Sequence, residues 1–404
     1  MARQEADERC TQGARTPMRK GVEMTDAIEP FTIDIDDSVL NDLRDRLART
    51  RFPDQIEGTG WDYGIPVDYL RELVDYWLES YDWRAEEARL NQVDHFRTTI
   101  DGQAIHFVHA RSTNPDAFPL LLIHGWPGSV VEFQEAIPLL TFPEAHGAHA
   151  ADSFHVIAPS LPGYGFSEPT RTTGWDIRRI ARAFIELMRM LGYSRYGAQG
   201  GDWGAQVSTR IAAYDPGHCV GLHLNMPIGS PPPEPGPLSE EEQADLADMA
   251  NFQKLESGYA NEQGTKPQTL GVGLNDSPAG LLGWIVEKFR GWSDCDGDPE
   301  TAFTRDQLIT NVMLYWATQT IASSARLYRE TMQGGALAEP MPFIEVPTGV
   351  ARFPKEILRW PRSWVETRYN LTHWTPMPRG GHFAAMEQPE LFADDVRRFF
   401  RTVR

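Results

Sequence analysis

Apolar residues recur at helical spacing in two early segments, 39–51 and 69–81. The spacing gathers Leu, Val and Trp side chains on one face of each segment, which predicts two amphipathic helices. Apolar and polar positions then alternate through 95–100 and 104–109, on either side of an Asp-Gly pair. This alternation predicts a β-hairpin. We therefore expect residues 28–94 to be mostly helical and a hairpin to follow them.

Beyond residue 118 the pattern changes to short apolar runs that alternate with amphipathic segments. Runs without polar positions are typical of strands that are buried on both faces of a parallel sheet. Their alternation with helical segments predicts an α/β fold with a mostly parallel central sheet. The expected strands cover 119–123, 154–158, 196–199 and 220–225, and the expected helices cover 176–191 and 203–214.

A proline-dense segment, 227–237, interrupts this alternation, and the next hundred residues show helical spacing only. Strand patterns return at 342–346 and 371–375, and a final helix is expected over 389–403. The simplest architecture is a sheet domain with a helical insertion after its sixth strand. The expected regions are a disordered extension (1–24), an N-terminal helical region (25–95), the sheet domain (96–226 and 341–404) and the inserted helices (227–340).

Composition narrows the class of protein. The 404 residues include 38 basic and 57 acidic ones, for a formal charge of −19. This balance argues against a nucleic acid or an anionic membrane as partner. No apolar run approaches the ~20 residues of a membrane-spanning helix. The polar first 25 residues lack the apolar core of a secretory signal, so we expect a cytoplasmic protein, with Met18 and Met24 as alternative starts to Met1. The three cysteines, Cys10, Cys219 and Cys295, show no metal-ligand spacing and form no disulfide framework.

The most informative motif is Gly200-Gly201-Asp202-Trp203-Gly204. Small residues two positions on either side of a nucleophile mark a nucleophile elbow, and here the nucleophile is an aspartate instead of a serine. A carboxylate that attacks an sp³ carbon becomes an ester, which water can cleave to regenerate the enzyme. The aspartate therefore predicts an electrophilic sp³ carbon, such as that of an epoxide or an alkyl halide, as the target.

A histidine and an acid are expected to complete a triad. His382 lies in a glycine-rich turn before the last helix, where an α/β-hydrolase carries its base. A histidine can activate water because its pKa lies near neutrality. The acid should follow the strand at 342–346, and Glu356 is the first acidic residue after the loop expected at 347–354. Glu345 is the rival, although it lies within that strand.

Two backbone N–H groups are expected to form an oxyanion hole. The turn His124-Gly125-Trp126-Pro127-Gly128 follows the first parallel strand, so Trp126 can supply one N–H and Trp203, directly after the nucleophile, the other. We expect His124 itself to be a hydrogen-bonded structural residue. A second glycine-rich loop, 163–167, lacks the lysine and spacing of a phosphate-binding loop.

Opening an epoxide also needs an acid for the leaving oxygen. A tyrosine hydroxyl can serve, because an alkoxide is far more basic than a phenolate. Tyr259, Tyr315 and Tyr328 lie in the helical insertion, and the pattern does not choose among them. A leaving halide would instead need N–H donors, which Trp203 could supply. A haloalkane or haloacid dehalogenase is therefore the main alternative, and a catalytically silent binding protein with a hydrolase fold is a remote one.

From residue 28 to the C-terminus, the chain resembles the microsomal-type epoxide hydrolases of the α/β-hydrolase superfamily, which include soluble bacterial and fungal members. The resemblance rests on several motifs together: His124-Gly125-Trp126-Pro127-Gly128-Ser129, the aspartate elbow, Glu256-Ser257-Gly258-Tyr259, Leu274-Asn275-Asp276-Ser277-Pro278, Arg326-Leu327-Tyr328-Arg329-Glu330, Phe353-Pro354-Lys355-Glu356 and Arg379-Gly380-Gly381-His382-Phe383-Ala384-Ala385.

The resemblance implies an α/β-hydrolase fold with a helical cap and an N-terminal meander that braces the cap. It implies that Asp202 is the nucleophile, His382 the base and Glu356 the acid, and that Tyr259 and Tyr328 open the ring. The implied reaction converts an epoxide and water into a vicinal diol, with no cofactor or metal. The membrane anchor of the microsomal members has no counterpart here, so we expect no integral anchor. A homodimer and roles in detoxification or aromatic hydrocarbon catabolism are further expectations, and natural-product tailoring stays open.

Overall fold

The computed structural model describes residues 27–404. The expected extension (1–24), the alternative starts Met18 and Met24, and Cys10 lie outside the described residues.

A nine-stranded sheet in the order β1-β2-β3-β5-β4-β6-β7-β8-β9 forms the centre of the protein. The pairs β1–β2, β2–β3 and β3–β5 are antiparallel. All the remaining neighbours in this order, from β5–β4 to β8–β9, are parallel pairs. The expected hairpin and parallel strands are thus confirmed. The strands are β1 Glu29–Phe31, β2 His95–Ile100, β3 Gln103–Ala110, β4 Phe118–Ile123, β5 Phe154–Pro159, β6 Tyr196–Gly200, β7 Cys219–Leu224, β8 Ile344–Arg352 and β9 Tyr369–Pro376.

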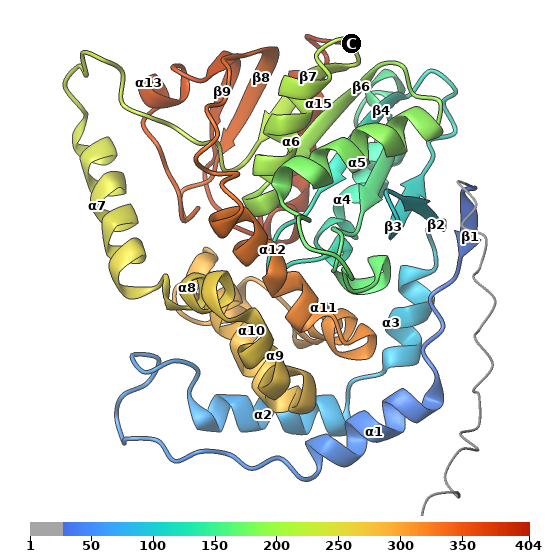
Figure 1. Cartoon of the computed structure of the whole chain (residues 1–404), viewed down its shortest axis with the longest axis vertical. Helices are drawn as coiled ribbons and strands as arrows, with labels where there is room; N and C mark the ends of the chain where they lie inside the picture. Colours follow the sequence, from blue (N-terminus) through green and yellow to red (C-terminus); the bar gives the residue numbers. More distant parts are fainter. Residues whose placement is uncertain (1–26) are drawn as a thin grey trace, which may run out of the picture.

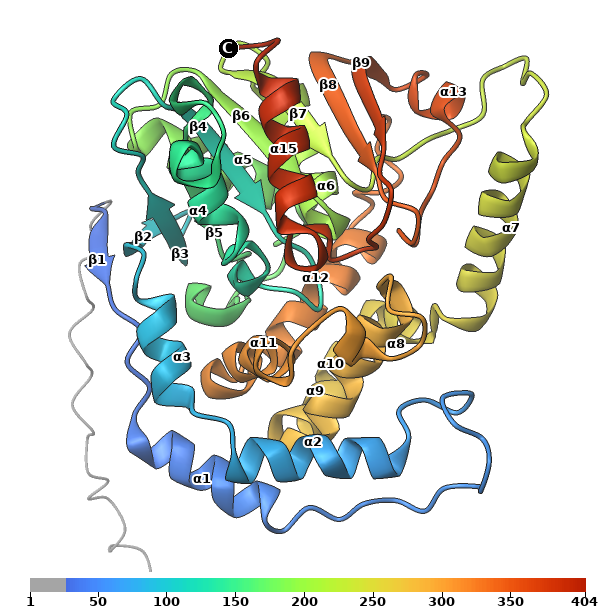
Figure 2. The same cartoon turned by 180° about the vertical axis from the view of Figure 1, so that it is seen from behind.

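Helices cover both faces of this sheet (Figures 1 and 2). α5 and α6 lie on one face, and α4 and α15 lie together on the other. Phe392, Phe399 and Phe400 of α15 are fully buried against the sheet strands. The helices are α4 Ala136–Thr141, α5 Ile177–Met190, α6 Asp202–Tyr214, α13 Arg362–Val365, α14 Ala384–Glu387 and α15 Pro389–Phe400, with short 3-10 turns η1 Val130–Phe133, η2 Pro143–His146, η3 Ala150–Asp152 and η4 Gly165–Ser167.

The N-terminal region runs beneath the inserted helices as an irregular arm (Figure 1). Two of its helices, α1 (Asp37–Leu47) and α2 (Val67–Glu79), match the amphipathic segments expected from the sequence. The strand β1 was not expected, because three residues are too short for a clear periodic pattern. The helix α3 (Trp83–Leu90) lies in the region expected to be mostly helical, but its eight residues were too few to mark it individually. Asp82 marks the start of α3 by accepting backbone hydrogen bonds from Arg84 and Ala85.

The inserted helices follow β7, which is the sixth strand expected from the sequence once the unforeseen β1 is set aside. Capping boxes at Ser239 and Thr304 start two of these helices. Leu70, Leu73 and Trp77 of α2 share one buried core with Leu281 and Ile285 of α10. The helices are α7 Glu240–Leu255, α8 Gly258–Thr265, α9 Pro267–Asp276, α10 Pro278–Trp292, α11 Arg305–Thr318 and α12 Ile321–Gln333, with the turn η5 Pro299–Thr301.

One boundary predicted from the sequence is wrong. The strand expected at 342–346 continues as β8 to Arg352, so the loop expected at 347–354 begins only after that residue. Pro347 ended the apparent pattern, yet it is accommodated where the register between β8 and β9 is irregular. Glu345 is exposed on this strand. It therefore lies outside the site, in contrast to Glu356.

Candidate active site

The elbow forms as the motif predicts. β6 ends at Gly200, and Asp202 begins α6 with a backbone φ of 49°. A positive φ is rare for an aspartate, and strain of this kind gathers at functional sites. A Cβ on Gly200 would collide with the backbone of Gly204, and one on Gly204 would collide with the carbonyl of Ile123. The two outer glycines are thus required because the strand, turn and helix pass so close together.

His382 connects the other two members of the expected triad. Its Nδ1 donates to Glu356 Oε1 at 2.6 Å, and its Nε2 lies 3.6 Å from Asp202 Oδ2. His382 and Glu356 are both buried. Burial by itself would lower the pKa of His382, but the negative charges of Glu356 and Asp202 raise it well above the ordinary value. The histidine is therefore held as a cation while Asp202 is ionised.

The loop that carries His382 is tied to the inserted helices. The His382 backbone N–H donates to the Trp292 carbonyl at the end of α10, and the two rings meet edge to face. Glu387 accepts the N–H groups of Gly381, Phe383 and Asp294, each at 2.9 Å. Burial raises the pKa of Glu387 to about 7. This carboxyl was not foreseen from the sequence.

The loop after Glu356 is held by α7. Arg359 donates to the Glu356 backbone carbonyl at 2.6 Å and to Asp245 Oδ1 of α7 at 2.6 Å. Asp245 is buried and also pairs with Arg352 at the end of β8. This ion-pair network fastens an otherwise exposed helix (Figure 1) to the segment that carries the acid.

The turn after β4 brings a backbone N–H to the nucleophile. Trp126 N donates to Asp202 Oδ1 at 2.8 Å. A Cβ on Gly125 would lie 2.6 Å from Asp202 Cγ, so only glycine leaves room for this approach. Trp203 follows Asp202 in the first turn of α6, where backbone N–H groups lack helical partners. Its part in an oxyanion hole stays a prediction.

Groups around this turn hold it in place. His124 bonds through Nδ1 to the Gly125 carbonyl and accepts the Leu161 N–H at Nε2, which agrees with the structural role expected for it. The Tyr315 hydroxyl donates to the Gly128 carbonyl at 2.6 Å. Tyr315 therefore supports the turn and is not directed at the nucleophile.

The other two tyrosines lie against the turn from the cap side. Tyr259 of α8 stacks on Trp126, with ring centroids 5.2 Å apart, and Tyr328 of α12 meets Trp126 and Trp203 edge to face. The two tyrosine rings are 5.9 Å apart. Burial, strengthened by the negative charge of Asp202, raises the pKa of both hydroxyls well above the ordinary value. They therefore stay protonated and able to donate.

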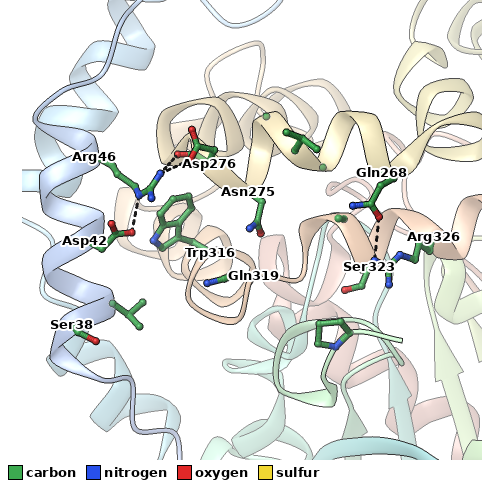
Figure 3. A pocket seen from close by; sticks show the side chains of 16 residues that line it. Ser38, Asp42, Arg46, Gln268, Asn275, Asp276, Trp316, Gln319, Ser323 and Arg326 are labelled. Atoms are coloured by element: carbon green, nitrogen blue, oxygen red, sulfur yellow. Dashed lines mark hydrogen bonds and ion pairs between the residues drawn. The ribbon is translucent and has the colours of Figure 1, made fainter. Parts of the chain in front are cut away.

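The structure has a small cavity beside the predicted triad and a much larger groove between the N-terminal helix α1 and the inserted helices. A small cavity beside Asp202 and His382 offers about 10 Å³ to the centre of a water molecule. A groove of about 930 Å³ runs between α1 and the helices α9, α11 and α12 (Figure 3). Arg46 of α1 bridges this groove by pairing with Asp276 of α9, and it also pairs with Asp42 on its own helix. None of the five predicted catalytic residues lines it, so the larger hollow is not the candidate active site.

Two absences concern residues 27–404 only. None of the helices there combines the length and apolar character needed to span a bilayer. The same residues contain no grouping of three or more histidine, cysteine or acidic side chains arranged to hold a metal ion.

Comparisons with known proteins agree with this geometry. Residues 28–133 match the model of the epoxide hydrolase N terminus, and residues 119–275 match that of the alpha/beta hydrolase fold. Epoxide hydrolase 1 of Sus scrofa is 41% identical over 405 residues, covering 93% of this chain and 88% of the relative.

Two solved structures are also similar over nearly the whole chain. Juvenile hormone epoxide hydrolase from Bombyx mori has a TM-score of 0.87 and 36% identity, with 95% of this chain and 96% of that one covered. Aspergillus niger epoxide hydrolase has a TM-score of 0.83 and 35% identity, with 94% and 97% covered. The chain therefore belongs to the epoxide hydrolase family, on an α/β-hydrolase fold.

Proposed function

We propose that the protein converts epoxides to vicinal diols through an ester on Asp202. Trp126 N–H holds Oδ1, which leaves Oδ2 free to attack an epoxide carbon in line with the breaking C–O bond. Tyr259 and Tyr328 donate to the epoxide oxygen as it becomes an alkoxide, and one of them gives it a proton. The resulting tyrosinate takes a proton from the His382 imidazolium, which leaves His382 neutral. The product of this step is a hydroxyalkyl ester.

The second step returns the free carboxylate. A water oxygen adds to the ester carbonyl carbon while neutral His382 takes one of its protons. The C–O bond to the diol oxygen then breaks, and His382 returns this proton to that oxygen. The carboxyl group left on Asp202 gives its proton to His382, which restores the carboxylate and the imidazolium. The N–H groups of Trp126 and Trp203 stabilise the oxyanion.

Formation of the ester also prepares His382 for this step. Esterification removes the charge of Asp202, which is one of the two charges that raise the pKa of His382. The histidine therefore becomes easier to deprotonate after ring opening, when a base is needed. Glu356 keeps the ring oriented and stabilises the imidazolium.

The tyrosine pair that packs on Trp126 carries this proposal, because the Trp126 N–H also holds the nucleophile and a tyrosine O–H can donate to a leaving alkoxide. The test is diol formation from styrene oxide, followed by chromatography, together with rapid quenching and mass measurement of the protein. We expect diol product and a transient mass increase equal to one epoxide. Asp202→Asn should abolish rapid ester formation, and turnover that survives Asp202→Ala would contradict it.

One observation favours dehalogenation as the second candidate. Nε1 of Trp126 and of Trp203 are buried and make no hydrogen bond of normal geometry within residues 27–404, and N–H groups are the donors that a leaving halide needs. A chlorinated alkane is therefore the control substrate. Turnover of this alkane without turnover of styrene oxide would reverse the assignment.

The proposal extends to the organisation of the chain and to its role in the cell. The regions 25–95, 227–340 and the two parts of the sheet domain act as meander, cap and catalytic core. A cytoplasmic location, a homodimer, and a role in detoxification or aromatic hydrocarbon catabolism complete the proposal. Size-exclusion chromatography with light scattering checks the dimer, and a panel of aryl and alkyl epoxides checks the role.

A further inference from the structure

The small cavity beside the nucleophile has the size and chemistry of a site for one water molecule. Its volume of about 10 Å³ is near the lower limit for holding one. Asp202 and His382 both line it, together with the polar side chains of Gln199, Asn225 and Glu132. Buried waters typically make about three hydrogen bonds to protein groups. The wall of this cavity supplies enough polar groups for that.

Three of these polar side chains, those of Gln199, Asn225 and Glu132, are not used by the mechanism described above. Gln199 is 1% exposed, and its Nε2 donates to Asn225, but its Oε1 has no partner of normal geometry among the described residues. Glu132 stands in η1 among the buried residues Val130, Val131 and Phe133. Burying an ionisable side chain among apolar residues costs free energy unless the side chain is hydrogen-bonded or paired.

The backbone makes room for the Glu132 carboxyl. A Cβ on Gly128 would collide with Glu132 Oε1, so the glycine at 128 leaves the space that the carboxyl fills. Burial raises the pKa of Glu132 to about 8. The positive charge of His382 lowers this pKa, and the negative charge of Asp202 raises it. Glu132 is thus mainly a neutral acid near pH 7, with one O–H donor and one carbonyl acceptor.

We propose that Glu132 is a positioning residue that holds the hydrolytic water in this cavity. The assignment rests on the covalent mechanism proposed above. The water donates one hydrogen to His382 Nε2 and the other to the acceptors on Glu132 and Gln199. Its free lone pair then faces the ester carbonyl carbon of Asp202. Glu132 neither forms a bond to the substrate nor keeps the transferred proton.

The experiment separates ring opening from ester hydrolysis. Single-turnover stopped-flow and rapid-quench mass measurements with styrene oxide give both rate constants for each variant. Glu132→Leu, which removes hydrogen bonding at similar size, should slow hydrolysis at least about tenfold and leave ring opening within about threefold. The ester should accumulate as a result. Glu132→Gln, which resembles the neutral acid, should restore hydrolysis to within about threefold of the wild type.

Controls distinguish this role from a structural one. Glu144→Leu makes the same change at an exposed site on the neighbouring turn η2 and should alter neither step. The ring-opening rate reports whether each variant has a folded site. Equal hydrolysis by wild type and Glu132→Leu, or Glu132→Gln as slow as Glu132→Leu, would overturn the proposal. If no ester forms in the wild type, the covalent mechanism fails instead.

A crystal structure of the wild-type protein tests the same point if Glu132→Leu does not fold. We expect one water within hydrogen-bond distance of both His382 Nε2 and the Glu132 carboxyl. A cavity without such a water, at a resolution where buried waters are seen elsewhere, overturns the assignment.

Discussion

Substitution of Gly125 by alanine should damage the nucleophile without touching a polar group. The added Cβ would lie 2.6 Å from Asp202 Cγ, whereas ordinary contacts are 3.4 Å or longer. Oδ1 and Cβ of Asp202 would lie closer still, so either the carboxylate or the turn must move by at least about 1 Å, and the Trp126 N–H bond to Oδ1 would be lost or bent. A displacement of ~1 Å can cost about 10²-fold in rate, or about 2.7 kcal/mol. Overpacking adds about 1–3 kcal/mol of lost stability.

The assay is single-turnover ring opening, followed through tryptophan fluorescence, because Trp126 and Trp203 adjoin the nucleophile. Gly273→Ala is the matched control. Gly273 is exposed on α9, and a Cβ added there would meet open space. Alanine at this position should leave the rate of ring opening unchanged and stabilise the folded protein slightly. Ring opening by Gly125→Ala within about threefold of the wild-type rate would refute the steric reasoning.

Three further predictions concern the tyrosines and the acid loop. Tyr259→Phe and Tyr328→Phe should each slow ring opening by about 10–100-fold and leave hydrolysis of a preformed ester nearly unchanged, as rapid quenching can show. Burial raises the pKa of both hydroxyls, so both should stay protonated in mild alkali. The rate constant of ring opening should therefore stay constant from about pH 8 to about pH 10. A decline in this rate at alkaline pH that disappears in Tyr259→Phe would contradict the reasoning. Asp245→Ala should lower the free energy of unfolding by about 1–3 kcal/mol and slow hydrolysis more than ring opening, because Arg359 loses its anchor beside Glu356. Asp248→Ala, which removes the exposed partner of the same arginine, serves as its control in chemical denaturation and should have little effect.

Features with local causes were predictable from the sequence. The elbow follows from glycine spacing, and the parallel strands follow from uninterrupted apolar runs such as 119–123. The order of Asp202 and His382 along the chain anticipated that they would meet, whereas the choice of Glu356 over Glu345 as the acid also needed the family resemblance. The choice of Tyr328 over Tyr315 needed the family resemblance, because both are buried tyrosines on neighbouring helices.

Other features depend on contacts between distant segments. Glu387 acts through three backbone N–H groups, one of them from Asp294 just after α10, and no periodic pattern marks such a role. The network of Asp245, Arg359 and Glu356 joins residues more than a hundred positions apart. The sequence does mark Glu132, because this acidic residue interrupts an apolar run in η1. Only the structure shows that it lines the same cavity as His382.

A single turnover in heavy-oxygen water, with enzyme in excess over styrene oxide, tests the covalent mechanism most directly. Water attacks the carbonyl carbon of the ester, so the diol takes its new oxygen from Asp202 and the label enters the carboxylate. We expect unlabelled diol from the first turnover, label in the peptide that contains Asp202, and labelled diol only in later turnovers. Label in the diol at the first turnover, with none in Asp202, would contradict the covalent intermediate.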